Sequence, residues 1–126
     1  MKKIIFFTLC LVLVNNCSIS QKAVVNKNVI IFSGVKQEEE TKRNLEVIRM
    51  AVKIYYSNHN KWPSNLHELV SEYGILKEIP FELIIGSNKV VEEFDGAGGW
   101  YYNKKEGLVK LNVKGKDSKG KNYSEW

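Results

Sequence analysis

The chain has 126 residues, of which 44% are hydrophobic and 26% are charged, and its formal net charge is +5. This length and balance are typical of one globular domain and exclude a collagen-like, disordered or multi-span membrane protein. Two cysteines exclude a disulfide scaffold, and two histidines and two aspartates leave few groups for metal or acid–base chemistry. Lysines outnumber arginines by 17 to 2, so the basic charge is carried mostly by mobile point charges.

The N-terminal segment has the pattern of a targeting signal. Lys2 and Lys3 give it a basic start, and residues 4–14 are then apolar apart from Thr8. As a helix this run would reach roughly 16 Å, about half of the hydrocarbon core of a bilayer. It therefore predicts a signal peptide over residues 1–16 and export across the bacterial inner membrane. Without the two lysines the net side-chain charge would be +3, which is too small to indicate a nucleic-acid partner by itself.

Cys17 follows the apolar run almost directly, with only Asn15 and Asn16 between them. This arrangement resembles a bacterial lipoprotein signal, in which the cysteine is acylated and becomes the first mature residue. Asn16 stands where such signals prefer a small residue. The alternatives are an ordinary cleaved signal and an uncut anchor, in both of which Cys17 is incidental. We expect a membrane-anchored, periplasmic or cell-surface protein.

A tether and a long helix are predicted next. Residues 17–36 have a polar start and then the apolar run Val29–Phe32, and we expect an extended segment that ends at Gly34. A helix is predicted from about residue 37 to residue 58, and its acidic first turn suits the positive end of the helix dipole. Its buried face is predicted from helical spacing as Leu45, Ile48, Val52 and Tyr55, widened by Val47, Ala51 and Ile54. The opposite, exposed side is expected to hold Lys42, Arg43, Glu46, Arg49 and Lys53.

A short second helix is predicted after the turn at Trp62 and Pro63. Ser64 is a good N-cap residue, and Gly74 stands where a C-cap belongs. The apolar face of this helix is expected to consist of Leu66, Leu69, Val70 and Tyr73. Residues 75–80 then connect it to the strands.

The remaining sequence alternates between apolar runs and turns, which predicts an antiparallel meander of three to four strands. These strands are expected at residues 81–85, 89–94, 100–102 and 108–113. Trp100 and Tyr102 share one face, and Trp100 is expected to pack towards the long helix. Because helices precede strands, the predicted fold class is α+β: a long spine helix and a short second helix, packed on a small antiparallel sheet. We expect residues 37–126 to form this globular domain.

No catalytic constellation emerges from the sequence. His59 and His67 are separated by a proline turn, neither cysteine has a base beside it, and the acidic runs do not converge. The stretch Asp95–Gly99 fits a tight turn better than a phosphate-binding loop, because no helix follows it. The lysines between residues 104 and 121 fit a solvated face or a nucleic-acid surface, and the absence of arginine there favours the solvated face. We expect no enzyme activity, cofactor or nucleic-acid partner.

Three blocks resemble the globular head of type IV pilins and type II secretion pseudopilins, over roughly residues 42–113. They are the helix end Ala51–Tyr56 with Trp62-Pro63-Ser64 after it, the pair Ile79-Pro80, and the hairpin Gly98-Gly99-Trp100-Tyr101-Tyr102-Asn103 with Gly107-Leu108-Val109-Lys110-Leu111-Asn112. Phe7-Thr8-Leu9 is similar to part of the pilin N-terminal motif. Phe6 and Leu11, however, replace the glycine at the peptidase cut and the glutamate used in subunit docking.

The resemblance implies a pilin-like fold in which the residues that match the motif are structural. These positions are Trp62, Pro63, Pro80, Gly98, Gly99, Trp100, Tyr102, Asn103, Gly107 and Asn112. It further implies a non-catalytic envelope protein that docks on other envelope, secretion or pilus proteins, as part of a type II secretion or type IV pilus apparatus. An atypical minor pilin or pseudopilin filament subunit is the alternative, and a small periplasmic enzyme is a weaker one. Some pseudopilins bind calcium in a C-terminal loop, where Asp117 is the matching candidate, although one acid among four lysines is a poor hard-cation site.

Overall fold

A computed structural model describes the backbone of residues 12–71 and 74–126, and the side chains of residues 33–71 and 74–126. The chain forms two units, Met1–Ser33 and Gly34–Trp126. We call the second unit the head. The predicted signal peptide, Cys17 and most of the predicted tether lie outside the residues whose side chains are described. Within the described ranges, no helix contains a stretch both long and apolar enough to cross a membrane.

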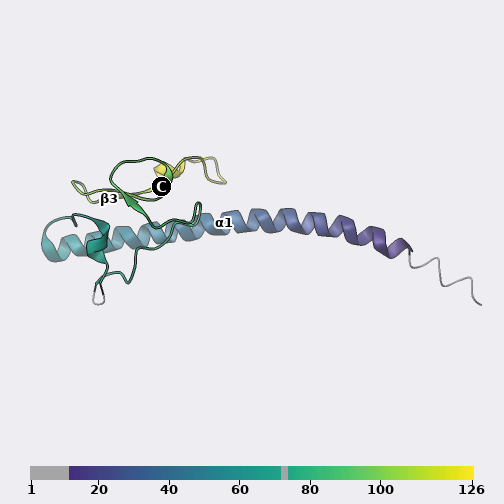
Figure 1. The fold of residues 1–126 in the computed structure, drawn as a ribbon, viewed down its shortest axis with the longest axis horizontal. Coiled ribbons are helices and arrows are strands. Elements are labelled where there is room, and N and C mark those ends of the chain that lie inside the picture. The colour runs from purple at the N-terminus through teal and green to yellow at the C-terminus, as the bar shows by residue number, and fades with distance from the viewer. Residues whose placement is uncertain (1–11, 72–73) are drawn as a thin grey trace, which may run out of the picture. The chain divides into compact units, whose positions relative to one another are not determined.

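The one α-helix among the described residues, α1, spans Val12–His59 (Figure 1). Gly34, Val35 and Lys36 are helical, so the expected break at Gly34 and the expected helix start near residue 37 are wrong. A glycine inside a helix costs only about 1 kcal/mol relative to alanine. A Cβ at Gly34 would meet no atom within 4 Å, so no tertiary contact requires the chain to turn there.

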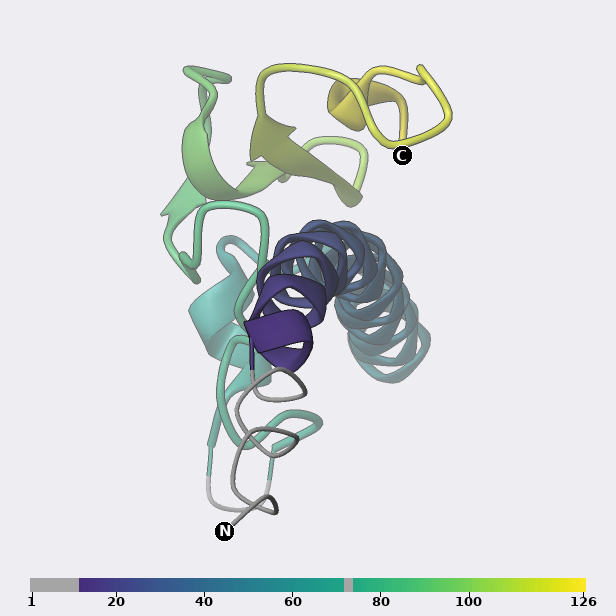
Figure 2. The same ribbon diagram turned by 90° about the vertical axis from the view of Figure 1, so that its right-hand side faces the viewer.

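The predicted buried face of α1 is confirmed at its centre. Leu45, Ile48, Ala51 and Val52 are at most 1% exposed, whereas Tyr55 is half-buried. Lys53 is exposed, as predicted. Around the part of α1 that belongs to the head, the strands lie above the helix in Figure 2, and η1, a single 3₁₀ turn at Leu66–Leu69, lies to its left, so that its right-hand side is open.

The predicted width of that face is wrong on both of its edges. Val47 and Ile54 are each 44% exposed, because the strands cover only one side of the helix. Arg49, expected on the exposed side, has only 27% of its side chain exposed. Its Nε and Nη2 donate to the carbonyl oxygen of Val109, and Nη2 also donates to that of Trp126. The long arginine stem therefore reaches back under the sheet.

The second helix is shorter than predicted and begins one residue later. Its N-cap is Asn65, whose side chain accepts a hydrogen bond from the backbone N–H of His67 at 2.9 Å. The predicted cap, Ser64, instead donates its hydroxyl to Glu68. Leu66 and Leu69 are fully buried, as predicted. The C-cap is Val70, so the predicted C-cap at Gly74 is wrong.

The sheet is mixed, with strand order β1-β2-β3, and the α+β class is confirmed. β1 (Val90–Val91) pairs parallel with β2 (Ala97–Asn103), and β2 pairs antiparallel with β3 (Leu108–Val113). The predicted hairpin between β2 and β3 is confirmed, with Trp100 opposite Leu111 and Tyr102 opposite Val109. The predicted all-antiparallel meander is wrong, because residues 92–99 bring the chain back alongside β1 in the same direction.

The predicted strand at residues 81–85 is also wrong. These residues belong to a tight loop that is closed by an antiparallel bridge between Glu82 and Ser87. Phe81 and Ile85 are 46% and 55% exposed, so their alternation with polar residues does not mark a buried face. The loop forms because the buried Glu82 carboxylate accepts hydrogen bonds from the loop's own backbone.

One hydrophobic core joins α1, η1 and the two long strands. Its largest members are fully buried side chains from each of these elements: Leu45, Ile48, Leu66, Leu69, Trp100, Tyr102 and Leu111. Trp100 lies in this cluster at 0% exposure, which confirms its predicted core position. The core therefore depends on β2 reaching over the helix.

We expect Trp100→Ala to lower the free energy of unfolding by about 3–5 kcal/mol, because it removes the largest buried side chain of the core. Phe94→Ala, at an aromatic residue that is 44% exposed, is the control and should cost less than about 1 kcal/mol. Urea unfolding of the two variants beside the parent measures both values. Equal losses in the two variants would contradict the anchoring role of Trp100.

Candidate functional site

The two buried aromatic side chains of β2 each hold the carbonyl oxygen of a proline. The Trp100 indole Nε1–H donates to Pro80 O at 2.7 Å, and the Tyr102 hydroxyl donates to Pro63 O at 2.7 Å. Burial, with smaller contributions from the charges of Glu68 and Tyr55, raises the pKa of Tyr102 to about 12. The phenol thus stays protonated as a donor. Four of the predicted motif residues meet in these two contacts, which attach both proline turns to the sheet.

The turn between β2 and β3 packs against the turn that follows α1. Gly107 has φ +65°, and a Cβ there would lie 2.4 Å from the Trp62 ring, so only glycine fits beneath the indole. The Trp62 ring also packs against Tyr56, with ring centroids 4.1 Å apart. Asn103 shapes the same β2–β3 turn by accepting a hydrogen bond from the backbone N–H of Lys105 at 3.0 Å.

Glu68 connects the proline turn to the end of α1. Its carboxylate accepts hydrogen bonds from the backbone N–H of Ser64 at 3.2 Å, from the Ser64 hydroxyl, and from the Tyr55 hydroxyl at 2.8 Å. The hydrogen bonds from Ser64 and then Tyr55 lower the pKa of Glu68. The bond to Glu68 in turn raises the pKa of Tyr55. Through these contacts Glu68 holds the proline turn at Ser64 against the end of α1.

Glu82 is a fully buried carboxylate that sequence reasoning missed. Four backbone N–H groups donate to it: those of Ile84 and Ile85 to Oε2, and those of Ser87 and Gly99 to Oε1. Backbone donors on this scale can satisfy a buried carboxylate without a cation. The sequence signal was a single acid between apolar residues, just before a Gly-Ser turn, and this pattern was interpreted as an alternating strand.

The two glycines of the motif let the chain pass close to Glu82 and β1. A Cβ at Gly99, where φ is +80°, would lie 2.1 Å from the carbonyl oxygen of Lys89. That carbonyl accepts the backbone N–H of Trp100 at 2.7 Å, which begins the parallel pairing. A Cβ at Gly98 would approach Glu82 Oε1 at 3.3 Å. Both positions are therefore structural.

Asn112 is fully buried and organises the turn before β2. Its Oδ1 accepts the backbone N–H groups of Asp95 and Gly96, and its Nδ2 donates to Asp95 Oδ1 and Gly98 O. The hydrogen bond from the Ala97 N–H, followed by the one from Asn112, lowers the pKa of Asp95. The glycine-rich stretch is thus a turn held by an amide.

Asp117, the calcium candidate, is occupied by donors. Oδ1 accepts the backbone N–H groups of Lys119 and Lys121, and Oδ2 accepts the Trp126 indole N–H at 3.2 Å and lies 3.6 Å from the Lys42 ammonium. Burial alone would raise the pKa of this carboxyl, but the hydrogen bonds and Lys42 outweigh it and lower the pKa. A carboxylate surrounded by N–H donors and an ammonium group does not fit a hard cation. No group of three or more potential metal ligands occurs in the described part of the chain.

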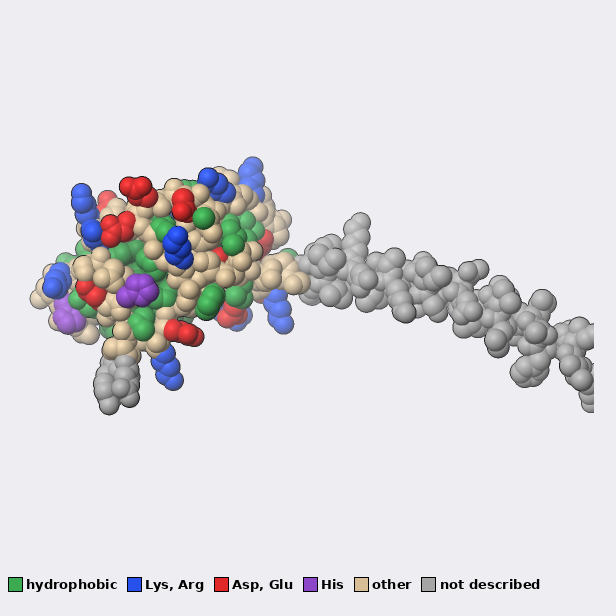
Figure 3. Space-filling model, viewed as in Figure 1, with side chains coloured by type: hydrophobic (Ala, Val, Ile, Leu, Met, Phe, Trp, Pro, Cys, Tyr) green, Lys and Arg blue, Asp and Glu red, His purple; other side chains and the backbone are tan. Residues whose placement is uncertain are grey.

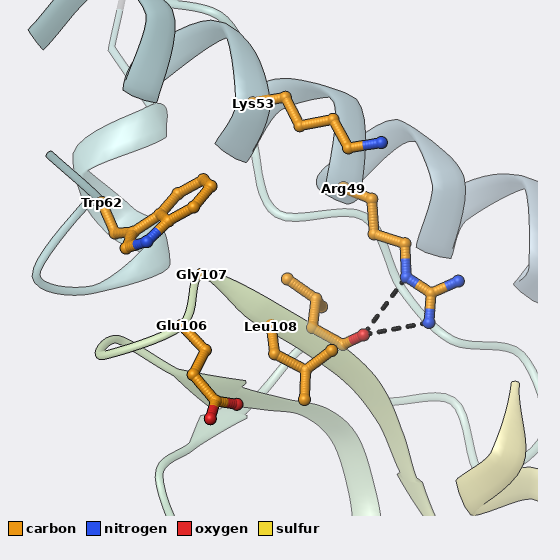
Figure 4. A pocket seen from close by; sticks show the side chains of 7 residues that line it. Arg49, Lys53, Trp62, Glu106, Gly107 and Leu108 are labelled. Atoms are coloured by element: carbon orange, nitrogen blue, oxygen red, sulfur yellow. Dashed lines mark hydrogen bonds between the residues drawn. The ribbon is translucent and has the colours of Figure 1, made fainter. Parts of the chain in front are cut away.

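A surface groove of about 300 Å³ lies between α1 and the β2–β3 turn. Arg49 and Lys53 line it from the helix, Trp62 from the following turn, and Leu108 from β3 (Figure 4). The guanidinium of Arg49 is committed to Val109, Trp126 and Glu46, so it is a structural group.

Catalytic side chains are not brought together at this groove. Its lining contains no serine, cysteine or histidine. His59 and His67 are both exposed, and the His59 ring packs on Tyr55 with centroids 4.3 Å apart. The side chains that line the groove are apolar (Trp62, Leu108 and Val109) or charged (Arg49, Lys53 and Glu106). Comparison of the chain with models of known families, with curated proteins and with solved structures found no match.

We expect Glu82→Gln to lower the free energy of unfolding by about 1–3 kcal/mol, the usual cost of unsatisfied buried polar groups. In either orientation, the glutamine NH₂ would face two backbone N–H donors instead of accepting from them. Glu78→Gln, at an exposed carboxylate, is the matched control and should change little. Denaturant unfolding measures both, and a loss no larger in Glu82→Gln than in Glu78→Gln would refute the role of Glu82.

Asp117→Asn should be less stable than the parent at neutral pH, and the difference should shrink in acid. The folded state lowers the pKa of Asp117 from its ordinary value of 3.8, so its stabilisation is present above that value and is lost as pH falls through the folded-state pKa. Urea midpoints of parent and variant at several pH values test this, with Glu93→Gln as an exposed control. A stability gap that stays constant or widens in acid would contradict it.

Proposed function

We propose that this protein is a non-catalytic, exported envelope protein whose pseudopilin-like head docks on other proteins, as part of a type II secretion or type IV pilus apparatus. The observation that carries the proposal is an apolar stripe on α1, outside the core. Val47, Met50 and Ile54 are 44%, 60% and 44% exposed and lie at helical spacing on one face. Large apolar side chains gathered on one face are typical of interaction sites.

The stripe lies on a firmly held part of the helix, which suits docking. Leu45, Ile48 and Val52 are buried on the opposite face of the same turns. Arg49 fixes the helix to β3 through the carbonyl oxygen of Val109. A partner would therefore meet a preformed surface, and binding would cost little ordering entropy.

The motif positions support the pseudopilin-like part of the proposal. Six of them attach the two proline turns and the hairpin to each other, through Trp100 with Pro80, Tyr102 with Pro63, and Trp62 with Gly107. The resemblance therefore rests on residues whose contacts organise the head. Residues 1–33 supply the export signal and, through Cys17 or an uncut apolar segment, the membrane anchor.

The alternative is an atypical minor pilin or pseudopilin that enters the filament. The same apolar stripe would then face a neighbouring subunit. The two forms differ at the N-terminus, because a filament subunit is held by its N-terminal helix whereas a lipoprotein is held by its acyl chains. The intact mass of the mature protein separates them: a diacylglyceryl group on Cys17 excludes the filament subunit, and a methylated Phe7 excludes the lipoprotein.

We expect a photo-cross-linking amino acid at position 50 to form covalent adducts with a second protein in the native host. The side chain of Met50 is the most exposed of the stripe and would lie at the centre of the contact. The matched control places the same amino acid at Glu78, an exposed polar position. Adducts detected on gels at position 50 and not at position 78 support docking through the stripe. Equal labelling at both positions, or none at position 50, would contradict it.

A further inference from the structure

Four lysines are concentrated in one short hairpin after β3. We call residues 114–122 the lysine loop, and its lysines are Lys114, Lys116, Lys119 and Lys121, all of them exposed. The only acidic residue of the loop is Asp117, whose side chain is 2% exposed. Its carboxylate points inward to the Trp126 indole and to Lys42. The fold thus removes the negative charge from the outer surface of the loop and leaves the positive charges there.

Glu38, an acidic residue of α1 that contacts the lysine loop, is also engaged in hydrogen bonds within the protein. The Glu38 carboxylate accepts hydrogen bonds from the backbone N–H of Ser118 at 2.8 Å, from its hydroxyl at 2.6 Å, and from the Tyr123 hydroxyl at 3.2 Å. Among the described residues, none of the four lysines forms an ion pair. Glu125 is exposed beyond the loop, so the loop carries a large excess of positive charge. In Figure 3, basic side chains project from the upper right of the head, where Figure 1 places the C-terminal segment.

The loop presents these charges from a fixed backbone. The backbone N–H of Asp117 donates to Lys121 O at 2.8 Å, and that of Gly120 donates to Asp117 O at 2.9 Å. The backbones of Lys116 and Asn122 pair in an isolated antiparallel β-bridge. The contacts of Ser118 with Glu38 attach the tip of the loop to the helix. The stem of Lys114 lies against Gly96, and the four lysine side chains are exposed on this held backbone. This combination suits attraction to a broad, diffuse anionic surface more than recognition of one ligand.

We propose that the lysine loop binds the anionic surface of a lipid bilayer. Lysine is a hydrated point charge, and each one close to an anionic leaflet strengthens partitioning about fivefold. Single-stranded nucleic acid is disfavoured, because such binding needs exposed aromatic rings for base stacking. Trp126 is 9% exposed with its indole N–H bonded to Asp117, and Tyr123 packs edge-on against Trp126 at 5.0 Å and bonds to Glu38. The aromatic residues of the loop region are thus committed to its interior.

The test is co-sedimentation of the full chain with lipid vesicles. One set contains equimolar phosphatidylglycerol and phosphatidylcholine, and the other contains phosphatidylcholine alone. The loop variant carries Lys114→Gln, Lys116→Gln, Lys119→Gln and Lys121→Gln. The charge-matched control carries Lys53→Gln, Lys61→Gln, Lys77→Gln and Lys89→Gln, all at exposed positions. Residues 1–33 are identical in parent, loop variant and control, so a difference between them in the phosphatidylglycerol-dependent part of binding is due to the substituted lysines.

We expect the loop variant to lose at least tenfold in the phosphatidylglycerol-dependent partition coefficient, against about fourfold or less in the control, given about fivefold per lysine that reaches the surface. Salt at about 1 M, where the Debye length is about 3 Å, should abolish the dependence in the parent. Equal losses in both variants would mean that binding depends on the net charge of the protein and not on the lysine loop, and this would overturn the proposal. So would a parent without phosphatidylglycerol dependence, or loop-dependent binding of an oligothymidylate that is tighter than that of the vesicles. The result is independent of docking through Met50, because the two surfaces share no residue.

Discussion

The head depends on two aromatic side chains of β2 that each perform two tasks. Trp100 and Tyr102 fill the core, and each also donates a hydrogen bond to a proline carbonyl that lies far from it in sequence. Burying an aromatic ring with a polar group is favourable only when that group finds a partner. The partners here are Pro80 and Pro63, at the turns that bound the segment between helix and sheet. One strand thereby sets the position of both turns.

Buried polar side chains organise the loops, whose backbone groups lie outside the short strands and are not paired by them. Glu82, Asn112 and Asp117 each gather several backbone N–H groups, which would otherwise lack partners inside a small domain. Two of these residues are acids, and neither presents its charge to solvent. The consequence reaches the surface: with Asp117 turned inward, the loop that it organises is left strongly basic on the outside. The inward position of Asp117 therefore accounts both for the backbone conformation of this loop and for its positive surface charge.

The two proposed binding surfaces differ in chemistry. The stripe of Val47, Met50 and Ile54 is apolar and lies on α1. The lysine loop is positively charged and follows β3. An envelope protein that contacts both a protein and a bilayer needs surfaces of these two kinds. The groove beside Trp62 is separate from both, and its lining includes Arg49 and Gly107, which have structural roles.

The sequence by itself determined the elements whose pattern is local. The spacing of Leu45, Ile48 and Val52 predicted the buried helix face, and the glycines and aromatic residues around Trp100 predicted the β2–β3 hairpin. Only the tertiary structure decided the rest, because the deciding partners are distant in the chain. Arg49 turns inward to reach Val109 and Trp126. Glu82, around which the loop at residues 81–85 forms, is attached to β2 through the N–H of Gly99. β1 runs parallel because Gly99 lets the chain approach Lys89. A periodic pattern records which side of an element is apolar, but it does not record which backbone donor a buried carboxylate will meet.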